Sequence, residues 1–185
     1  GVVYMSSPAR HHSHGKPHWQ AIHWLGSYVV ATPGVDASDN GTVRMDFDNE
    51  PQPDVLLRIE PQAGGKSWIS EDDYVEGVPE LIIEIAASSV SYDLHDKLNV
   101  YRRNGVQEYL VWQVQDNRVD WFELKEGEYV SLEPDENGIL RSRVFPGLTL
   151  AVPQLLKGDL AAVLAELQRG IESPEHAAFV QRLVP

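Results

Sequence analysis

The sequence predicts an α/β fold class, in which a mixed β-sheet core is flanked by helices and followed by a C-terminal helical tail. Residues 16–30 carry apolar side chains at helical spacing, whereas residues 81–86 form an apolar run of the length that is typical of a buried strand. A second helical segment, residues 92–104, separates that run from another apolar strand at residues 109–114. This order of strands and helices indicates an α/β protein.

Each element has a local signal. Alternating side chains predict a strand over residues 42–47, and Glu126-Gly127 predicts the turn of a hairpin. Ser91 is a suitable N-cap for the second helix, and Gly105 is suited to end it. In chain order, the predicted elements are a strand at 2–5, a helix at 16–30, strands at 42–47 and 53–59, a loop at 61–79, a strand at 81–86, a helix at 92–104, and strands at 109–114, 118–124, 129–132, 140–145 and 148–152, the last two finishing the sheet.

The end of the chain has a different pattern. Leucine and valine residues recur at helical spacing from Leu155 to Leu167, which predicts an amphipathic helix. Gly170 and Pro174 interrupt this pattern, and a last helix is predicted over residues 175–183. The amphipathic helix either covers the sheet or packs on a partner.

Composition limits the classes of function. At 185 residues we expect one main domain, residues 1–152, with a C-terminal helical extension, residues 153–185. The chain contains no cysteine, which excludes disulfides and cysteine chemistry and fits a cytoplasmic protein. No apolar run is long enough to span a membrane. The net charge of −13 disfavours non-specific DNA binding, which depends on basic residues.

Three residues form the candidate catalytic set. Asp54 follows Pro53 at the start of a predicted strand, Glu84 is the single charge in the apolar run at 81–86, and Lys97 lies on the next helix. Two acids can hold a hard divalent cation, which activates a water and stabilises charge on phosphate. A lysine ammonium can orient that water or neutralise the phosphate oxygens. The set therefore predicts phosphodiester hydrolysis with Mg²⁺ or Mn²⁺ as the cofactor.

Each of these residues also has a simpler interpretation. Asp54 can be an acid of a turn or a strand start, since Pro-Asp pairs are common in loops. An ionised carboxylate inside an apolar strand costs several kcal/mol unless it is paired, so Glu84 should be protonated, paired with an arginine, or bound to metal. Lys97 can instead form a solvated i,i+4 ion pair with Asp93, worth only ~0.3–0.5 kcal/mol. The histidines between His11 and His18 can suggest zinc, but their spacing matches no strong zinc motif, and solvated imidazoles are the better interpretation.

The wider sequence resembles the putative restriction endonuclease family (Uma type) of the PD-(D/E)XK nuclease superfamily. The resemblance covers roughly residues 1–152 and departs from the superfamily pattern at one position. Lysine usually stands two residues after the second acid, where this chain has Ala86. The resemblance therefore suggests that Lys97, on the following helix, takes the role of that lysine. The segments that carry the resemblance are Gln52-Pro53-Asp54-Val55-Leu56-Leu57, Pro79 to Ser89, Tyr92-Asp93-Leu94-His95-Asp96-Lys97-Leu98, Tyr101 to Tyr109, and Phe145-Pro146-Gly147-Leu148.

The resemblance implies a restriction-endonuclease-like fold, a truncated start, a homodimer, and hydrolysis of DNA to products with a 5′-phosphate. It implies that Asp54 and Glu84 bind the metal together with the backbone carbonyl of Ile85, while Lys97 positions the attacking water. Candidates for supporting positions around these residues are Ser88, Asp93 and His18. The alternative function is a non-catalytic binding or scaffold protein on the same fold, which the net charge and the displaced lysine favour.

Overall fold

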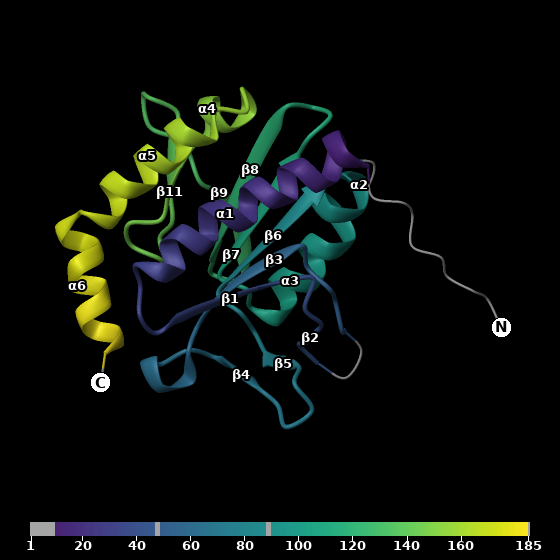
Figure 1. Ribbon diagram of the computed structural model, residues 1–185. Coiled ribbons are helices and arrows are strands. Elements are labelled where there is room, and N and C mark those ends of the chain that lie inside the picture. The colour runs from purple at the N-terminus through teal and green to yellow at the C-terminus, as the bar shows by residue number, and fades with distance from the viewer. Residues whose placement is uncertain (1–9, 47–48, 88–89, 185) are drawn as a thin grey trace.

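The computed structural model describes residues 10–46, 49–87 and 90–184, and a six-stranded mixed sheet forms its centre (Figure 1). The strand order is β1-β3-β6-β7-β8-β9, in which β6 and β7 pair in parallel and all other neighbours pair antiparallel. The strands are β1 (Val35–Asp39), β3 (Val55–Ile59), β6 (Leu81–Ala86), β7 (Glu108–Gln113), β8 (Arg118–Lys125) and β9 (Glu128–Ser131).

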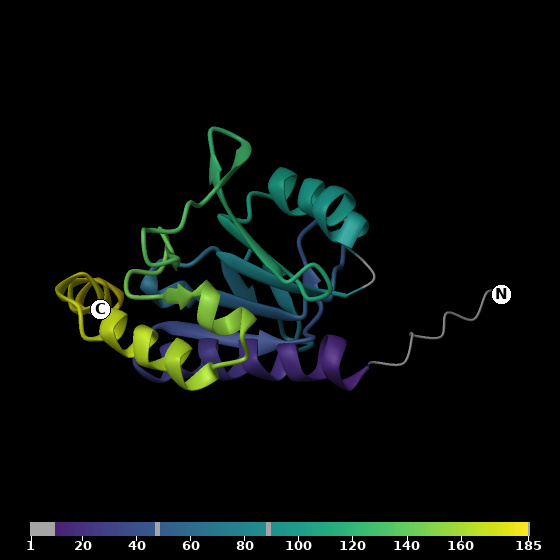
Figure 2. The ribbon, with the colours of Figure 1, turned by 90° about the horizontal axis from the view of Figure 1, so that it is seen from above.

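Helices cover both faces of this sheet. Helix α1 lies on one face together with α5, whereas η3 and α3 lie on the other face, between β6 and β7 in the sequence (Figure 2). The helices are η1 (His11–Gly15), α1 (Lys16–Val30), η2 (Pro61–Ala63), α2 (Val90–Tyr92), η3 (Asp93–Lys97), α3 (Leu98–Asn104), α4 (Val152–Leu156), α5 (Leu160–Ile171) and α6 (Pro174–Leu183).

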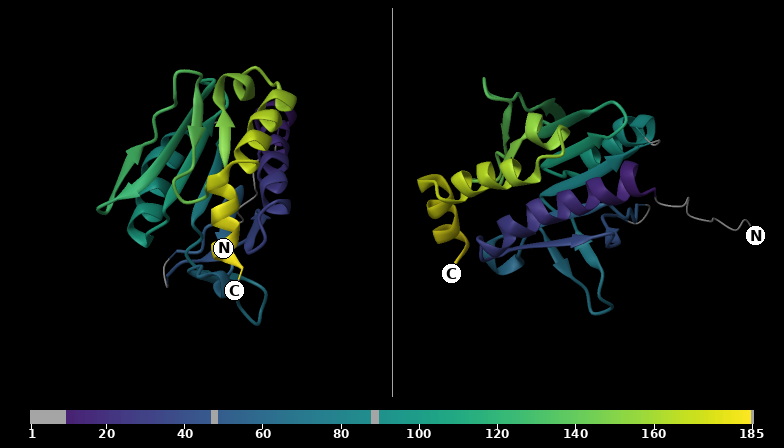
Figure 3. Two further views of the ribbon diagram at one scale, coloured as in Figure 1. Left: turned by 90° about the vertical axis from the view of Figure 1, so that its left-hand side faces the viewer. Right: turned by 45° about the horizontal axis from the view of Figure 1, so that its top comes forward.

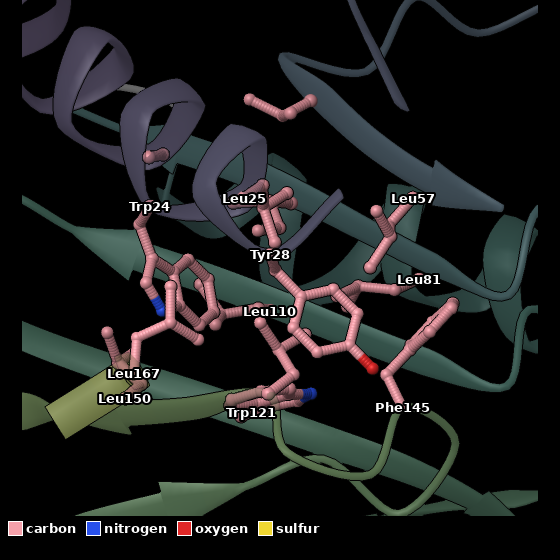
Figure 4. Packing of buried hydrophobic residues seen from close by; sticks show 14 of the residues in the cluster. Trp24, Leu25, Tyr28, Leu57, Leu81, Leu110, Trp121, Phe145, Leu150 and Leu167 are labelled. Carbon is pink, nitrogen blue, oxygen red and sulfur yellow. The ribbon is translucent and has the colours of Figure 1, made fainter. Parts of the chain in front are cut away.

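The larger core cluster lies between α1 and the sheet. Trp24 and Tyr28 of α1 point at sheet residues such as Leu110 and Trp121 (Figure 4), and all four side chains are at least 97% buried. The indole N–H of Trp24 also donates to the carbonyl of Thr149 in β11 (Thr149–Ala151), 2.9 Å away. Each large apolar side chain buried here contributes about 1.5–3 kcal/mol, so this layer supplies much of the driving force for folding.

The predicted helix at 16–30, the strand at 81–86 and the hairpin are confirmed. The hairpin turn has positive φ at both central residues, 51° at Glu126 and 83° at Gly127, as a tight two-residue turn requires. Gly105 ends α3 in the left-handed conformation, with φ of 84°, which is the predicted capping role. The sequence pattern that predicts each of these elements comes from residues close together in the chain.

The prediction of a loop over residues 61–79 is wrong. This segment contains η2, β4 (Ser67–Ile69) and β5 (Val75–Gly77), and β5 pairs with both β4 and β2 (Val43–Arg44) in a three-stranded sheet. The carboxylate of Glu80 accepts the backbone N–H of Ile59 at 2.8 Å and of Lys66 at 3.2 Å, which ties the segment to the main sheet. Strands of three residues or fewer are too short to show periodicity.

The prediction that residues 140–145 and 148–152 finish the main sheet is also wrong. They contribute β10 (Ile139–Arg141) and β11, which pair only with each other as a separate two-stranded sheet in the part of the chain described here. The carboxylate of Glu108 accepts the N–H of Arg143 at 2.6 Å and the hydroxyl of Ser142 at 2.8 Å. These contacts bend the chain directly after β10 instead of continuing a strand.

Three smaller predictions need correction. Ser91 is not an N-cap, because it lies inside α2, and only Val43–Arg44 of the predicted strand at 42–47 is a strand within the described residues. Gly170 does not end the helix but lies within α5, where an added Cβ would be 2.2 Å from the carbonyl oxygen of Gly147. The predicted strand at 2–5 lies outside the described residues.

The C-terminal helices pack on the rest of the chain. Helix α5 contacts α1 and β11 (Figure 3). Val163, Leu167, Phe179 and Leu183 all join the larger core cluster. The interpretation that the amphipathic helix covers the body of the protein is therefore the one that these contacts favour. Within the described ranges, no helix is both long and apolar enough to cross a membrane.

Candidate active site

Strand geometry places Asp54 and Glu84 on the same face of the sheet. Strands β3 and β6 pair with Val55 opposite Ile83, so continuing the register by one residue brings Asp54 beside Glu84. Successive side chains of a strand point to opposite faces, and both Val55 and Ile83 belong to the cluster beneath α1. Asp54 and Glu84 therefore face the side that η3 and α3 cover.

Asp54 is held from several directions. One carboxylate oxygen, Oδ2, accepts the backbone N–H of Ile85 at 2.6 Å, and the other, Oδ1, lies 3.5 Å from Nε2 of His14. The Nε2–H group of His18 donates to the backbone carbonyl of Asp54 at 2.8 Å. These contacts connect the start of α1 to the start of β3, and they fix the carboxylate just before the strand.

Glu84 is a buried carboxylate with two partners. Its side chain is 3% exposed, Oε2 lies 2.8 Å from Nζ of Lys97, and Oε1 accepts the hydroxyl of Tyr101 at 2.7 Å. Burial raises the pKa of Glu84 to about 7, and the nearby charge of Asp54 adds to the rise, while Lys97 and Tyr101 oppose it. A positive charge arriving at this site would favour the ionised form.

Lys97 reaches Glu84 and Asp93 from η3, which is a π-helical turn. Its ammonium lies 2.8 Å from Glu84 and 3.1 Å from Asp93, and the Asp93 side chain is only 2% exposed. The alternative of a solvated Lys97–Asp93 pair is therefore wrong, because Asp93 is buried and Lys97 also pairs with the buried Glu84. Burial alone would lower the pKa of Lys97, but these two carboxylates outweigh it and raise the pKa, so the ammonium stays charged.

The supporting positions have different outcomes. Asp93 and His18 contact the central residues directly, through Lys97 and through the carbonyl of Asp54 respectively. Ser88 lies outside the described residues. The structure shows Ile85 acting through its N–H group, and a metal-ligating role of its carbonyl stays a prediction.

Sequence reasoning missed the hydroxyl of Tyr101 and gave little weight to His14. Tyr101 belongs to the buried stripe of α3, and its position four residues after Lys97 is the signal that could have placed it beside Glu84. His14 and His18 are also four residues apart, with ring centroids separated by 5.5 Å on one side of the helix. Spacing of this kind indicates a shared face, but only the folded structure shows what that face contacts.

The donor set fits a small, hard cation. Two carboxylates lie side by side, and Mg²⁺ is commonly bound by one or two carboxylates while it keeps several waters. Across residues 10–46, 49–87 and 90–184, no group of three or more histidine, cysteine, aspartate or glutamate side chains is arranged to hold a metal.

Comparison with known proteins places the chain in a family. The family described as putative restriction endonuclease, Uma2, matches residues 1–153. The chain belongs to this family. The resemblance noted from its sequence segments is thereby confirmed. Because the match ends at residue 153, α5 and α6 lie beyond the matched region.

A solved structure supports the fold of this Uma2 family member. It is a crystal structure described as a putative nuclease belonging to DUF820 from Anabaena variabilis, with a TM-score of 0.58 and 15% sequence identity. The alignment covers 89% of the present chain and 87% of the other chain. The likeness confirms the predicted α/β fold with its mixed sheet and flanking helices. No curated protein matches the chain.

Proposed function

We propose that this protein is a Mg²⁺- or Mn²⁺-dependent endonuclease that hydrolyses phosphodiester bonds in DNA. The observation that carries the proposal is the buried carboxylate of Glu84, which lies beside Asp54 and 2.8 Å from the ammonium of Lys97. A buried acid with a strongly raised pKa, next to a second acid and a lysine, is typical of a functional site. Membership of the Uma2 family supports the same interpretation.

Asp54 and Glu84 would hold the cation, with the carbonyl of Ile85 as a third ligand. When bound, the cation would activate a water and stabilise the negative charge that develops on phosphate. The Ile85 N–H group and the His18 imidazole keep Asp54 in place, so the carboxylate needs little reorganisation to bind. Preorganisation of this kind lowers the free-energy cost of assembling the site.

Lys97 acts as a fixed cation in this proposal. Two of its three N–H donors point at Glu84 and Asp93, which leaves the third to orient the attacking water or contact a phosphate oxygen. Because its neighbours raise the pKa of Lys97, the side chain stays protonated at neutral pH and does not serve as a general base. Its contribution is therefore electrostatic and orienting.

We further propose that DNA is the partner, that cleavage leaves a 5′-phosphate, and that the protein acts in the cytoplasm as a homodimer. The resemblance supports the first two statements and the dimer, and the cysteine-free composition fits a reducing compartment. Light scattering on the purified chain measures its mass directly. A monomer at all concentrations would remove the dimer from the proposal and leave the chemistry unchanged.

The test of the activity is nicking of supercoiled plasmid with Mn²⁺ or Mg²⁺. The wild-type protein is compared with Asp54→Ala, Glu84→Gln and Lys97→Ala, and Lys157→Ala is the control because Lys157 is an exposed lysine of the α4–α5 turn. We expect metal-dependent nicking by the wild type and the control and none by the three site variants. Thermal melting with and without Mn²⁺ separates lost chemistry from lost folding or lost metal binding.

The variants are expected to differ in metal binding. Asp54→Ala should keep its fold and lose the rise in melting temperature that Mn²⁺ produces, whereas Lys97→Ala should keep that rise. If folded wild-type protein nicks no plasmid and no divalent cation changes its melting temperature, the endonuclease proposal is wrong. The net charge of −13 then favours the alternative, a non-catalytic binding or scaffold protein on the same fold.

A further inference from the structure

Each candidate metal-binding carboxylate has one oxygen that a protein donor already occupies. Oδ2 of Asp54 accepts the Ile85 N–H at 2.6 Å, and Oε1 of Glu84 accepts the Tyr101 hydroxyl at 2.7 Å. The second oxygens, Oδ1 of Asp54 and Oε2 of Glu84, instead lie beside His14 and Lys97. Each acid thus has one oxygen held by a neutral donor and the other beside a basic side chain, which for Glu84 is the ammonium of Lys97 at 2.8 Å.

The two neutral donors are of different kinds. The Ile85 N–H belongs to the backbone of β6, so no side-chain substitution can remove it without replacing the residue by proline. The Tyr101 hydroxyl is a side-chain donor, and a single substitution to phenylalanine removes it. At Tyr101, the loss of a single oxygen atom therefore removes the hydrogen bond to Oε1 of Glu84.

Tyr101 has little freedom to turn away from Glu84. Its side chain is fully buried, and its ring packs edge-on against Tyr109 with centroids 5.0 Å apart. Tyr109 is itself fixed, because its hydroxyl donates to the backbone carbonyl of Asp93 at 3.0 Å. The Tyr101 hydroxyl is thereby held in place to donate to Oε1 of Glu84.

We propose that Tyr101 is a positioning residue that makes Glu84 a one-oxygen ligand and thereby selects Mg²⁺ or Mn²⁺ over Ca²⁺. Ca²⁺ takes six to eight oxygen ligands and often both oxygens of one carboxylate, whereas Mg²⁺ takes six and readily keeps waters. A glutamate that keeps one oxygen in a hydrogen bond to a tyrosine offers the metal its other oxygen, which suits the coordination of Mg²⁺ better than that of Ca²⁺. This inference rests on the metal site of the proposed function.

A purely structural tyrosine predicts a different result. If Tyr101 only fills space, Tyr101→Phe keeps the ring packing and changes the affinity for every divalent cation by the same factor. If Tyr101 limits Glu84 to one oxygen, the substitution releases Oε1 and changes the affinities unequally. The ratio of the two dissociation constants, for Ca²⁺ and for Mn²⁺, is therefore the quantity that separates the two roles.

The experiment measures Mn²⁺ and Ca²⁺ binding to the full chain by calorimetry at one alkaline pH, without DNA. Tyr109→Phe is the matched control, because Tyr109 is also a buried tyrosine with one hydrogen bond, and that bond does not go to a carboxylate. In Tyr101→Phe we expect Mn²⁺ affinity to fall about tenfold, the usual order for lost outer-sphere contacts. Ca²⁺ affinity should hold or rise, so the preference for Mn²⁺ contracts about tenfold by the same estimate.

The possible results test the selectivity role of Tyr101 separately from the existence of the metal site. If wild type and Tyr101→Phe bind both cations with the same preference, the selectivity role of Tyr101 is overturned while the metal site stands. If Tyr109→Phe changes the preference as much as Tyr101→Phe does, the effect comes from general loosening and the role is again overturned. If folded wild-type protein binds neither cation, the metal site of the proposed function fails, and the inference fails with it.

Discussion

Glu84 and Glu108 are buried carboxylates on neighbouring strands, and their partners separate a reactive acid from a structural one. Burial raises the pKa of each to about 7. The partners of Glu84 include a lysine ammonium, whereas those of Glu108 are the hydroxyl of Ser142 and backbone N–H groups such as that of Arg143. A raised pKa alone therefore does not identify the site.

Glu108 gives a pH-dependent prediction. Its pKa is raised from 4.5 to about 7 in the folded protein, so between these values the folded state binds more protons than the unfolded state. Stability should therefore fall as pH rises through this window and level off above it. Glu108→Gln has no such proton to lose, so its free energy of unfolding minus that of the wild type should increase by about 2.5 kcal/mol between about pH 5 and about pH 8.

Urea unfolding at a series of pH values measures this difference. Glu133→Gln is the control, because it removes a carboxylate that is exposed to solvent. Its stability should follow that of the wild type across the range. A difference between Glu108→Gln and wild type that stays constant with pH would show that Glu108 does not carry the raised pKa.

The three central residues of the site could be predicted from the sequence, but two of their partners could not. Asp54 and Glu84 stand out because strand periodicity and a lone charge in an apolar run are local signals. The contact of His14 with Asp54 joins segments 40 residues apart, and no spacing rule reports such a contact. Tyr101 lies on the buried face of its helix, but the spacing of apolar residues that indicates such a face says nothing of where a hydroxyl points.

At the scale of elements, local patterns predict which segments form but not which segments pair. The helix α1, the strand β6 and the β8–β9 hairpin all have complete local signals, and all are present. The strands β10 and β11 were correctly expected as strands, but their separation from the main sheet depends on Glu108, which lies more than 30 residues earlier in the chain. Tertiary contacts of this kind decide sheet membership.

Helix α5 gives a prediction at this scale. Leu167 is fully buried in the larger core cluster, so Leu167→Ala should leave a cavity and lower the free energy of unfolding by about 2–5 kcal/mol. Val184→Ala is the control, because Val184 is 54% exposed, and it should change stability by less than about 0.5 kcal/mol. Chemical denaturation measures both variants.

The shape of the Leu167→Ala transition matters as well. If α5 folds with the rest of the protein, the variant unfolds in one transition that is shifted as a whole. An unshifted main transition, preceded by a separate early loss of helix, would show that residues 153–185 form an independent extension that the core does not need.

At the scale of the whole molecule, the charge distribution must be reconciled with a DNA partner. The net charge is −13, and at least eight of the 15 lysines and arginines are already paired with carboxylates: Arg44, Arg58, Lys97, Arg102, Arg118, Lys125, Arg141 and Arg169. Five of the seven histidines lie in η1 and α1, and two of these, His14 and His18, contact Asp54. At most seven of the 15 lysines and arginines are therefore left to contact phosphate.

This distribution predicts weak, metal-dependent DNA binding with a shallow response to salt. Affinity for duplex DNA falls with a slope of about −0.9 per neutralised phosphate in a log–log plot against salt concentration, so two or three phosphate contacts give a slope of about −2 to −3. We expect Lys97→Ala, which keeps both carboxylates, to bind a short duplex with such a slope in Mn²⁺. Its binding should fall below detection when the cation is removed with a chelator, because two adjacent acids then face the phosphates.

Fluorescence anisotropy of a labelled duplex measures this binding, and Asp54→Ala in the presence of Mn²⁺ is the matched control for a site without its cation. A slope steeper than about −6 would require about seven or more phosphate contacts, far more than the two or three expected at the site. That result, or equal binding with and without Mn²⁺, would mean that DNA contacts a different surface from the one that carries Asp54 and Glu84.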